Sequence, residues 1–312
     1  MREALYGPDG FFTRPGPGPA AHFRTSAHAS PLFAGALARL LSTVDSALGR
    51  PDPLDVVDMG AGRGELLIAL LAAVPPETAA RIRATAVELA PAPDNLPARI
   101  SWTAEPPTGI TGLLFATEWL DNVPVDVVAD GRYVLADGSA GPPVEPADAE
   151  WLDRWWPRGP VAEVGVERDA AWAGAVGCVT RGLALAVDYG HLREDRPAFG
   201  TLTGYRDGRQ VPPVADGSCD VTAHVAIDSA ADAGGRFSTV PPGIFRQREA
   251  LRALGIDGAR PPLALAHHEP GRYLRELSSA SAAAELTDEA GLGDHYWIVQ
   301  PVGIPLVIPE VR

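Results

Sequence analysis

Lysine is absent from the sequence, and arginine supplies all 26 of its Lys and Arg side chains. This absence excludes Schiff-base catalysis, a lysine general base and the phosphate-binding loop that needs Gly-Lys. Cysteine is nearly absent too, because Cys178 and Cys219 are too few for a disulfide framework or a cysteine-rich zinc site. No apolar run approaches the length of a membrane span, and the first residues lack the pattern of a signal peptide. We therefore expect a cytoplasmic protein, in a reducing compartment, without a membrane partner.

Positive charge is also scarce, since the net charge of the chain is −14 at pH 7. Nucleic acids bind to basic patches, so this balance argues against a nucleic-acid partner. It is consistent with a soluble protein that takes a cationic substrate. The 312 residues are enough for one large domain or for a core with an inserted subdomain.

The most informative stretch is an apolar run that ends at Asp58 and leads into Gly60, Gly62 and Gly64. A helix-forming segment follows at 65–73, so the pattern predicts a buried strand, a tight turn and a helix that open an α/β sheet. Glycine permits positive φ and lets a ligand lie against the backbone, while the start of the helix offers free N–H groups. A tight turn without a ligand is the alternative interpretation.

The glycine spacing indicates which ligand to expect. A dinucleotide fingerprint needs a third glycine where Glu65 stands, so that interpretation fails. The pattern Gly-x-Gly-x-Gly behind an acid resembles motif I of the class I S-adenosylmethionine-dependent methyltransferases. A second strand at 82–89 ends in Glu88 and Leu89. An acid at this position can accept hydrogen bonds from both ribose hydroxyls, although it could also be a solvated carboxylate at a strand end.

The remaining segments fill out an α/β pattern. We expect strands at 100–103, 110–117, 182–187 and 296–299, with a hairpin at 125–128 and 132–135. We expect helices at 32–48, 148–156, 167–179, 220–231, 245–254 and 272–286. The polar stretch 192–217 is interpreted as a long hairpin or a substrate-facing loop.

Several motifs together resemble one family. They are Tyr6-Gly-x-x-Gly-Phe-Phe12, Phe23-Arg-Thr-Ser26, Ser30-Pro-Leu-Phe33, Asp58-Met-Gly-Ala-Gly-Arg-Gly64, Glu118-Trp-Leu-Asp-Asn-Val-Pro124, Asp188-Tyr-Gly190, Asp220-Val-Thr-Ala-His-Val225, Gln247-Arg-Glu249 and Gly291-Leu-Gly293. The chain resembles the MidA family, whose mitochondrial members are complex I assembly factor methyltransferases. It departs from the family pattern at 21–24 and at Thr117, and it is short for the family. These departures bear on the identity of the substrate more than on the identity of the cofactor.

The resemblance implies an α/β fold, a Rossmann-like class I methyltransferase with a mostly parallel seven-stranded sheet and family-specific insertions. It divides the chain into an N-terminal arm and helix over the cofactor site (1–49) and a methyltransferase core (50–312). Substrate-facing insertions are expected around 125–160 and 192–245. The cofactor is S-adenosylmethionine. Its expected binding residues are Thr25, Ser26, Asp58, Gly60, Ala61, Gly62, Gly64, Glu88, Leu89 and Glu118.

The candidate acceptor site follows the strand at 110–117. Glu118 and Asp121 are spaced i, i+3 and could clamp a guanidinium with bidentate hydrogen bonds. Alternatively, Glu118 contacts the cofactor and Asp121 caps a turn. Asp188 and Tyr189 end the next core strand, either lining the acceptor site or packing there. His224 is expected on a helix, as a proton acceptor or as a structural residue.

Three functions remain open from the sequence. The first is methylation of a protein arginine, the second is N- or O-methylation of a small molecule, and the third is a non-catalytic assembly factor that binds the cofactor. The acceptor is expected to be a protein or a cationic small molecule, and a homodimer is possible. His267, His268 and Glu269 lack partners at ligand spacing, so no metal is expected.

Overall fold

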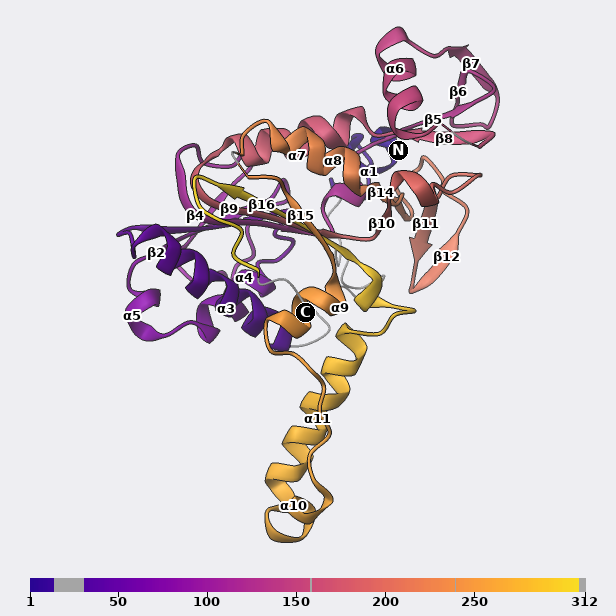
Figure 1. Cartoon of the computed structure of the whole chain (residues 1–312). Coiled ribbons are helices and arrows are strands. Elements are labelled where there is room, and N and C mark those ends of the chain that lie inside the picture. The colour runs from indigo at the N-terminus through magenta and orange to yellow at the C-terminus, as the bar shows by residue number, and fades with distance from the viewer. Residues whose placement is uncertain (14–30, 158, 239, 309–312) are drawn as a thin grey trace.

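The computed structural model describes residues 1–13, 31–157, 159–238 and 240–308 (Figure 1). At its centre lies a seven-stranded sheet. In spatial order its strands are β15 (Gly243–Arg246), β16 (Tyr296–Val302), β9 (Val179–Asp188), β4 (Ile110–Thr117), β1 (Leu54–Met59), β2 (Ile82–Val87) and β3 (Ile100–Thr103). The five strands from β9 to β3 are parallel, and β16 is antiparallel to both of its neighbours. This architecture confirms the expected mostly parallel seven-stranded sheet.

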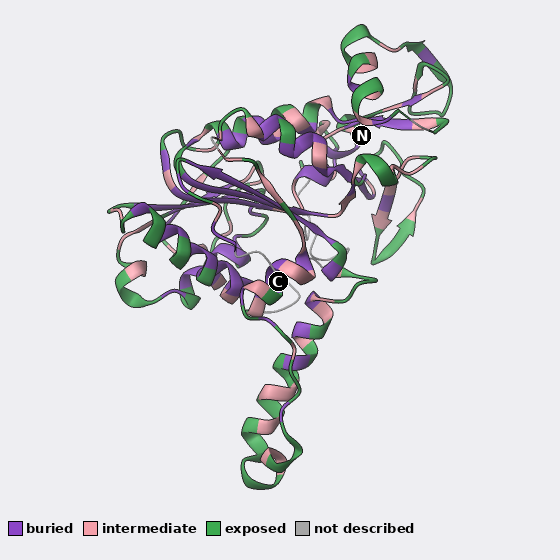
Figure 2. Ribbon diagram, viewed as in Figure 1, coloured by how far each residue is buried: buried purple, intermediate pink, exposed green. Residues whose placement is uncertain are grey.

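The central strands are apolar on both faces because helices cover both faces. Helices α3 (Pro31–Leu48) and α4 (Glu65–Ala73) pack on one side, and α7 (Val166–Gly177) and α8 (Ile227–Gly235) pack on the other (Figure 1). Every residue of β1 is buried, and the buried sheet runs through the middle of the molecule in Figure 2. The helix and strand predicted around the glycine turn are both confirmed.

Three smaller sheets surround this core. Strands β5 (Asp126–Ala129), β6 (Arg132–Val134), β7 (Ala140–Pro143) and β8 (Val161–Val164) form an antiparallel sheet with α6 (Pro146–Trp155) between β7 and β8. We call residues 126–164 the inserted sheet. A second sheet contains β11 (Thr203–Arg206), β12 (Arg209–Val211) and β13 (Asp220–Thr222), and β10 (Gly190–His191) pairs with β14 (Val225–Ala226). The hairpin expected at 125–135 is confirmed.

Five further α-helices lie in the described part of the chain. They are α1 (Arg2–Tyr6), α5 (Pro76–Ala79), α9 (Gln247–Ala253), α10 (Leu263–His268) and α11 (Pro270–Leu286). Helices α10 and α11 project from the core as an arm (Figure 1), and only the second half of α11 contains buried residues. None of the helices in the described ranges is long and apolar enough to cross a membrane.

Two predicted helices are wrong at their first residues. Residues 220–226 form β13 and β14, so the expected helix begins only at Ile227. Residues 243–246 form β15, and α9 begins at Gln247. In each case pairing with a distant strand decides the conformation, because β13 pairs with β11 and β15 pairs with β16. Tertiary pairing of this kind overrides local propensity.

The sheet places the candidate motifs at one edge. Strands β2 and β4 lie on either side of β1, and the chain reverses its order across the sheet at this point. Open α/β sheets bind their ligands outside the carboxyl ends of the strands at such a switch point. The residues that follow β1, β2, β4 and β9 are therefore the candidate site.

Candidate functional site

The glycine turn between β1 and α4 has the backbone that the sequence predicts. Gly60, Gly62 and Gly64 adopt φ angles of 68°, 58° and 81°. A Cβ atom at Gly60 would lie 2.6 Å from Cδ1 of Trp119, so this glycine is required by close packing. A Cβ atom at Gly62 would meet no described atom within 4 Å, beyond its own chain neighbours. Gly62 thus offers a backbone surface without a side chain at the expected ligand position.

Glu88 lies beside this turn because Met59 of β1 pairs with Val87 of β2. Its carboxylate accepts the N–H groups of Gly62 at 3.0 Å, Leu89 at 2.7 Å and Ala90 at 3.0 Å. The acid is therefore held at the carboxyl end of β2, where a ribose acceptor is expected. Leu89 is exposed next to it. The structure brings these residues together as expected, and their roles toward a ligand stay predictions.

Asp58 lies behind the turn and is buried. Its Oδ2 atom is buried and has no hydrogen-bond partner in the described part of the chain. Burial raises the pKa of this carboxyl well above its ordinary value, and the fields of Glu88 and Glu65 add to the shift. Buried polar atoms are normally satisfied, so an orphaned oxygen behind a glycine turn is consistent with a ligand there.

The segment after β4 passes over the glycine turn. Its first residue, Glu118, has a φ of 51° and donates its N–H to the Val187 carbonyl at 2.8 Å. Trp119 then covers Gly60, and a single 3₁₀ turn, η2 (Leu120–Asn122), follows. Trp119 stands between Glu118 and Asp121 in the chain and packs against Gly60. It therefore links the expected acceptor-binding acids to the glycine turn.

Asp121 is fully buried and forms several hydrogen bonds. Its Oδ2 atom accepts hydrogen bonds from the Tyr189 hydroxyl and, at 2.7 Å, from Thr222 Oγ1. Its N–H donates to Oδ2 of Asp188 at 3.2 Å, which ties β9 to the turn. Its Oδ1 atom has no partner within the described ranges. Glu118 is only half-buried, so the two acids lie at different depths, and the joint clamp stays a prediction.

His224 is placed next to these groups, but it is not on a helix. It lies between the short strands β13 and β14, which corrects the expected helix. Its ring meets the Tyr189 ring edge-on, with centroids 5.1 Å apart. Residue 224 keeps an exposed surface, while burial of its ring among the neighbouring groups lowers the imidazole pKa from its ordinary value. A neutral imidazole beside Tyr189 can accept a proton.

Burial dominates the electrostatics of the acids. It raises the pKa of Asp121 and Asp188, and it raises that of Asp220 to about 8. Asp220 lies beside Asp121, whose charge adds to the shift, and its Oδ1 atom accepts from Asn122 Nδ2 at 3.4 Å. Its Oδ2 atom is buried without a described partner. A nearby cation would favour the charged form of all three groups.

Several residues of the site escaped the sequence analysis. Tyr6 of α1 donates its hydroxyl to the Asn122 carbonyl at 3.2 Å. Burial raises the pKa of this hydroxyl, and the charges of Asp121, Glu88 and Asp220 add to the shift. Tyr6, Asp220 and Thr222 lie within motifs that carry the family resemblance, which is the signal that could have found them. Arg168 carries no such signal, because it stands in an ordinary amphipathic helix.

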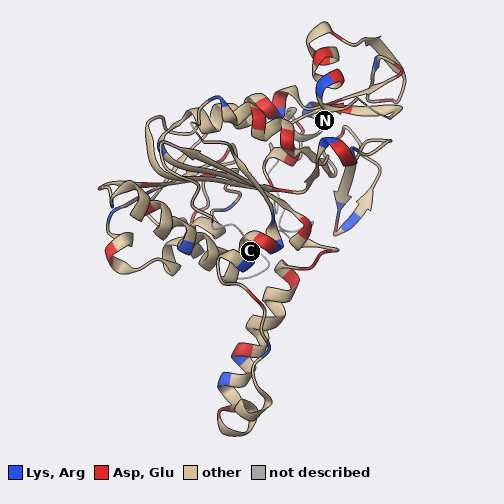
Figure 3. Ribbon diagram, viewed as in Figure 1, with Lys and Arg blue, Asp and Glu red and all other residues tan. Residues whose placement is uncertain are grey.

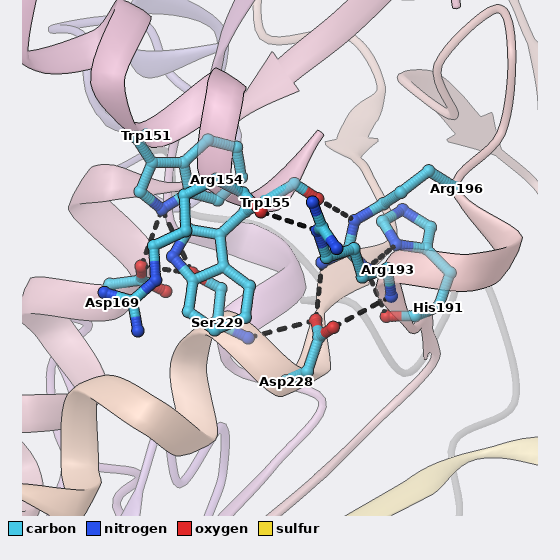
Figure 4. Close-up of polar contacts among 9 residues, drawn as sticks. All are labelled: Trp151, Arg154, Trp155, Asp169, His191, Arg193, Arg196, Asp228 and Ser229. Atoms are coloured by element: carbon cyan, nitrogen blue, oxygen red, sulfur yellow. Dashed lines mark hydrogen bonds and ion pairs between the residues drawn. The ribbon is translucent and has the colours of Figure 1, made fainter. Parts of the chain in front are cut away.

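The inserted sheet is attached beside this site by two arginines (Figure 4). Arg196 donates to the Trp155 carbonyl at 2.9 Å, to the His191 carbonyl at 2.7 Å and to Asp228. Arg193 donates to the Arg154 carbonyl at 2.7 Å. The carbonyls at the end of α6 have no partner within their own helix, and these contacts satisfy them.

Two expected cofactor residues, Thr25 and Ser26, lie outside the described residues. Within the described ranges, no group of three His, Cys, Asp or Glu side chains could hold a metal ion.

A family model described as "Putative S-adenosyl-L-methionine-dependent methyltransferase" matches residues 36–243, more than half of the chain. The chain belongs to this family. Its cofactor is S-adenosylmethionine, and the open backbone at Gly62, the held carboxylate of Glu88 and the orphaned oxygen of Asp58 fit that ligand.

Solved structures agree with this family. A crystal structure from Burkholderia thailandensis, described as a "likely methyl transferase" bound to S-adenosylhomocysteine, is 26% identical and has a TM-score of 0.78. The alignment covers 99% of this chain and 88% of that chain. A native crystal structure of a protein of the same superfamily and organism is 26% identical, with a TM-score of 0.77 and coverage of 99% and 87%. No curated protein matches the methyltransferase sequence with significance.

Proposed function

We propose that this methyltransferase transfers the methyl group to a cationic nitrogen acceptor, and that the acceptor is an arginine side chain of a protein. One observation carries the proposal. Asp121 and Asp220 are 0% exposed, lie side by side and each keep one carboxyl oxygen without a described partner. Because burial of a carboxylate costs free energy unless a cation or hydrogen bonds compensate it, a cationic acceptor suits this pair.

The charge of the buried Arg168 favours the ionised form of Asp121, but this arginine donates none of its described hydrogen bonds to either acid. Arg168 uses its donors on four backbone carbonyls. The carboxyl oxygens of Asp121 and Asp220 therefore stay available to a guanidinium, which binds carboxylates through parallel hydrogen bonds. Figure 3 also shows acidic residues along the ribbons of α6, α7 and α8, and their charge would attract a basic segment of a partner protein. The resemblance to the MidA family supports the same acceptor class.

In this proposal each residue of the site has a separate role. Bound S-adenosylmethionine supplies an electrophilic methyl group. Asp121 and Asp220 hold the cationic acceptor, and Trp119 links their turn to the cofactor turn at Gly60. A guanidinium that accepts a methyl group must release one proton, and the neutral imidazole of His224 accepts it. Glu88 and the glycine turn hold the nucleoside and methionine parts of the cofactor.

The test uses Asp121→Asn and Asp220→Asn for the proposed acceptor-binding pair, with Asp130→Asn as a control in the hairpin between β5 and β6. S-adenosylhomocysteine affinity is measured by calorimetry, and transfer is measured with a pool of arginine-containing peptides and labelled S-adenosylmethionine. Loss of one partner of a buried charge pair costs roughly 2–5 kcal/mol, so Asp121→Asn should lower transfer at least about tenfold. We expect its cofactor affinity and the Asp130→Asn variant to stay normal.

Two outcomes would contradict the assignment. Normal transfer by both Asp121→Asn and Asp220→Asn would show that these acids do not hold the acceptor. A collapse of cofactor affinity in either variant would place that acid in the cofactor site. Hydrolysis of the peptides and mass analysis identify methylarginine. Label found only in neutral small molecules of a cell extract would favour the small-molecule methyltransferase instead.

A further inference from the structure

Arg168 is a buried cation that the reaction does not itself require. It stands in the first turn of α7, and only 2% of its surface is exposed. Its Nε atom donates to the Val123 carbonyl at 2.9 Å, and Nη2 donates to the Asp121 carbonyl at 2.6 Å. Its Nη1 atom donates to the carbonyls of Ala223 and His224, at 3.0 and 2.7 Å. Every one of these acceptors belongs to the backbone.

The four carbonyls come from two segments that are far apart in the sequence. Residues 121–123 form the turn after β4, and residues 223–224 connect β13 to β14. Because a guanidinium is a rigid, planar fork, its donors fix the distance and angle between the two segments. One segment presents the carboxyl group of Asp121 and the other presents the imidazole of His224. The arginine thus sets the separation of the proposed acceptor-binding acid and the proposed proton acceptor.

The main chain of His224 is held from its other side as well. Its N–H donates to Thr201 Oγ1 at 2.8 Å. Thr201 in turn donates its hydroxyl to Oε2 of the buried Glu163 at 2.7 Å, and Glu163 lies on β8 of the inserted sheet. The peptide groups on both sides of the His224 Cα are therefore hydrogen-bonded to side chains. This arrangement fixes the main chain from which the imidazole contacts Tyr189.

Burial disfavours the charged form of Arg168, and nearby acidic groups favour it. Burial lowers its pKa from the ordinary value, while the charges of Asp121, Asp188 and Glu163 oppose that shift. A neutral residue could not satisfy four carbonyls, and lysine has fewer donors on a flexible chain without the planar fork. An arginine is therefore the side chain that the position requires.

We propose that Arg168 is a positioning residue which, together with Thr201, holds His224 at the separation from Asp121 that acceptor methylation needs. The functional part of this inference rests on the proposed transfer to arginine. The structural part concerns only the placement of His224. A displacement of about 1 Å can slow an enzymatic reaction roughly 100-fold, so loss of this arrangement should be visible in turnover.

The test compares Arg168→Lys with Arg81→Lys. Arg81 also donates to a backbone carbonyl, that of Pro51, and to Asp45, but it precedes β2 at the opposite edge of the sheet. Three properties are measured on the full chain: S-adenosylhomocysteine affinity, transfer to the arginine peptide pool and the NMR resonances of the His224 ring. The seven histidines make assignment practical, with His224→Gln to identify the signal.

We expect Arg168→Lys to bind S-adenosylhomocysteine normally, to shift the His224 resonances and to lower transfer roughly 10- to 100-fold. Arg81→Lys should lower the midpoint of thermal unfolding while it leaves transfer and the His224 signals unchanged. A folded Arg168→Lys protein with wild-type transfer and wild-type His224 resonances would overturn the inference. If the wild-type protein does not methylate arginine peptides, the proposed function fails, and the His224 resonances still decide the positioning role.

A second variant covers the case in which Arg168→Lys does not fold. Thr201→Val removes the hydrogen bond to the His224 N–H and leaves the arginine in place. We expect the same shift of the His224 signals and a smaller loss of transfer, again with normal S-adenosylhomocysteine affinity. Unchanged His224 signals and unchanged transfer in this variant would overturn the inference as well.

Discussion

Gly62 combines a left-handed backbone with an open surface. Its φ is 58°, and no described atom other than its chain neighbours lies within 4 Å of the position of a Cβ. A valine there would place two methyl groups where the cofactor is expected and would strain the backbone. We expect Gly62→Val to weaken S-adenosylhomocysteine affinity at least about 100-fold, equivalent to ~2.8 kcal/mol, as measured by calorimetry.

Gly138 provides the matched control for this prediction. It has a φ of 80° and an equally open surrounding, but it lies in the turn between β6 and β7 of the inserted sheet. Gly138→Val should carry a similar backbone strain without any loss of cofactor affinity. Equal affinities of a folded Gly62→Val protein and the wild type would place the cofactor away from this turn.

At the scale of elements, the attachment of α6 to the core rests on buried polar contacts. The Arg196 side chain is 2% exposed, and removal of one partner of a buried ion pair is strongly destabilising. We expect Arg196→Met to lower the free energy of unfolding by about 3 kcal/mol. Hydrogen exchange should increase in 146–156 and 191–196 before it increases in β1 or β4.

Arg193 is the control for this prediction because it is exposed and contacts the same helix end. A single exposed hydrogen bond contributes about 1 kcal/mol or less, so Arg193→Met should change stability little. Equal losses of stability in the two variants would contradict the special role of Arg196. Uniform exchange throughout the protein would show that the inserted sheet and the core unfold as one unit.

The N-terminal arm is a second element with a testable role. Helix α1 packs with β13 in a small apolar cluster, and Tyr6 reaches the Asn122 carbonyl. We predict that residues 6–30 fold over the cofactor; of these, residues 14–30 lie outside the described residues, and Tyr6 lies within the field of both Glu88 and Asp121. We expect hydrogen exchange of this segment to slow when S-adenosylhomocysteine binds, since a closed segment excludes water. Identical exchange with and without the ligand would contradict a lid.

For the whole molecule, the buried acids predict an unusual dependence of stability on pH. The pKa of Asp220 is about 8 in the fold, against an ordinary value of 3.8. Between these values the folded protein holds a proton that the unfolded chain has lost. The stabilisation is therefore complete below the unfolded pKa and disappears as the pH rises through the folded pKa. The contribution of Asp220 to the stability of the wild-type protein should fall from about pH 5 to about pH 8, by up to ~1.4 kcal/mol per pH unit.

Asp220→Asn removes this titration and can keep the hydrogen bond from Asn122. Chemical denaturation at about pH 5 and about pH 8 should therefore show a smaller decline in the free energy of unfolding for the variant than for the wild type. The other buried acids, Asp58 and Asp188, are present in both proteins, so their contributions cancel in the comparison. Parallel stability curves for the two proteins would contradict the raised pKa of Asp220.

Local patterns in the sequence determined the fold and the cofactor turn. The strand at 54–59, the helix at 65–73 and the strands at 82–87 and 110–117 were all predicted, because each is a continuous run with its own turn signal. Glu88 was found for the same reason, since parallel neighbours place their carboxyl ends at one edge. The start of α8 and of α9 was misplaced, because pairing with distant strands decides residues 220–226 and 243–246.

Only the tertiary structure decided how the acceptor side is assembled. The sequence indicated Asp121, Tyr189 and His224 as separate candidates. It did not show that the Tyr189 hydroxyl contacts Asp121 while the Tyr189 ring contacts His224. It gave no sign of Arg168, because four carbonyls from two distant segments leave no periodic pattern in the chain. The packing of α7 against the sheet edge determines which carbonyls Arg168 can reach. That packing depends on the whole fold and cannot be read from a local pattern.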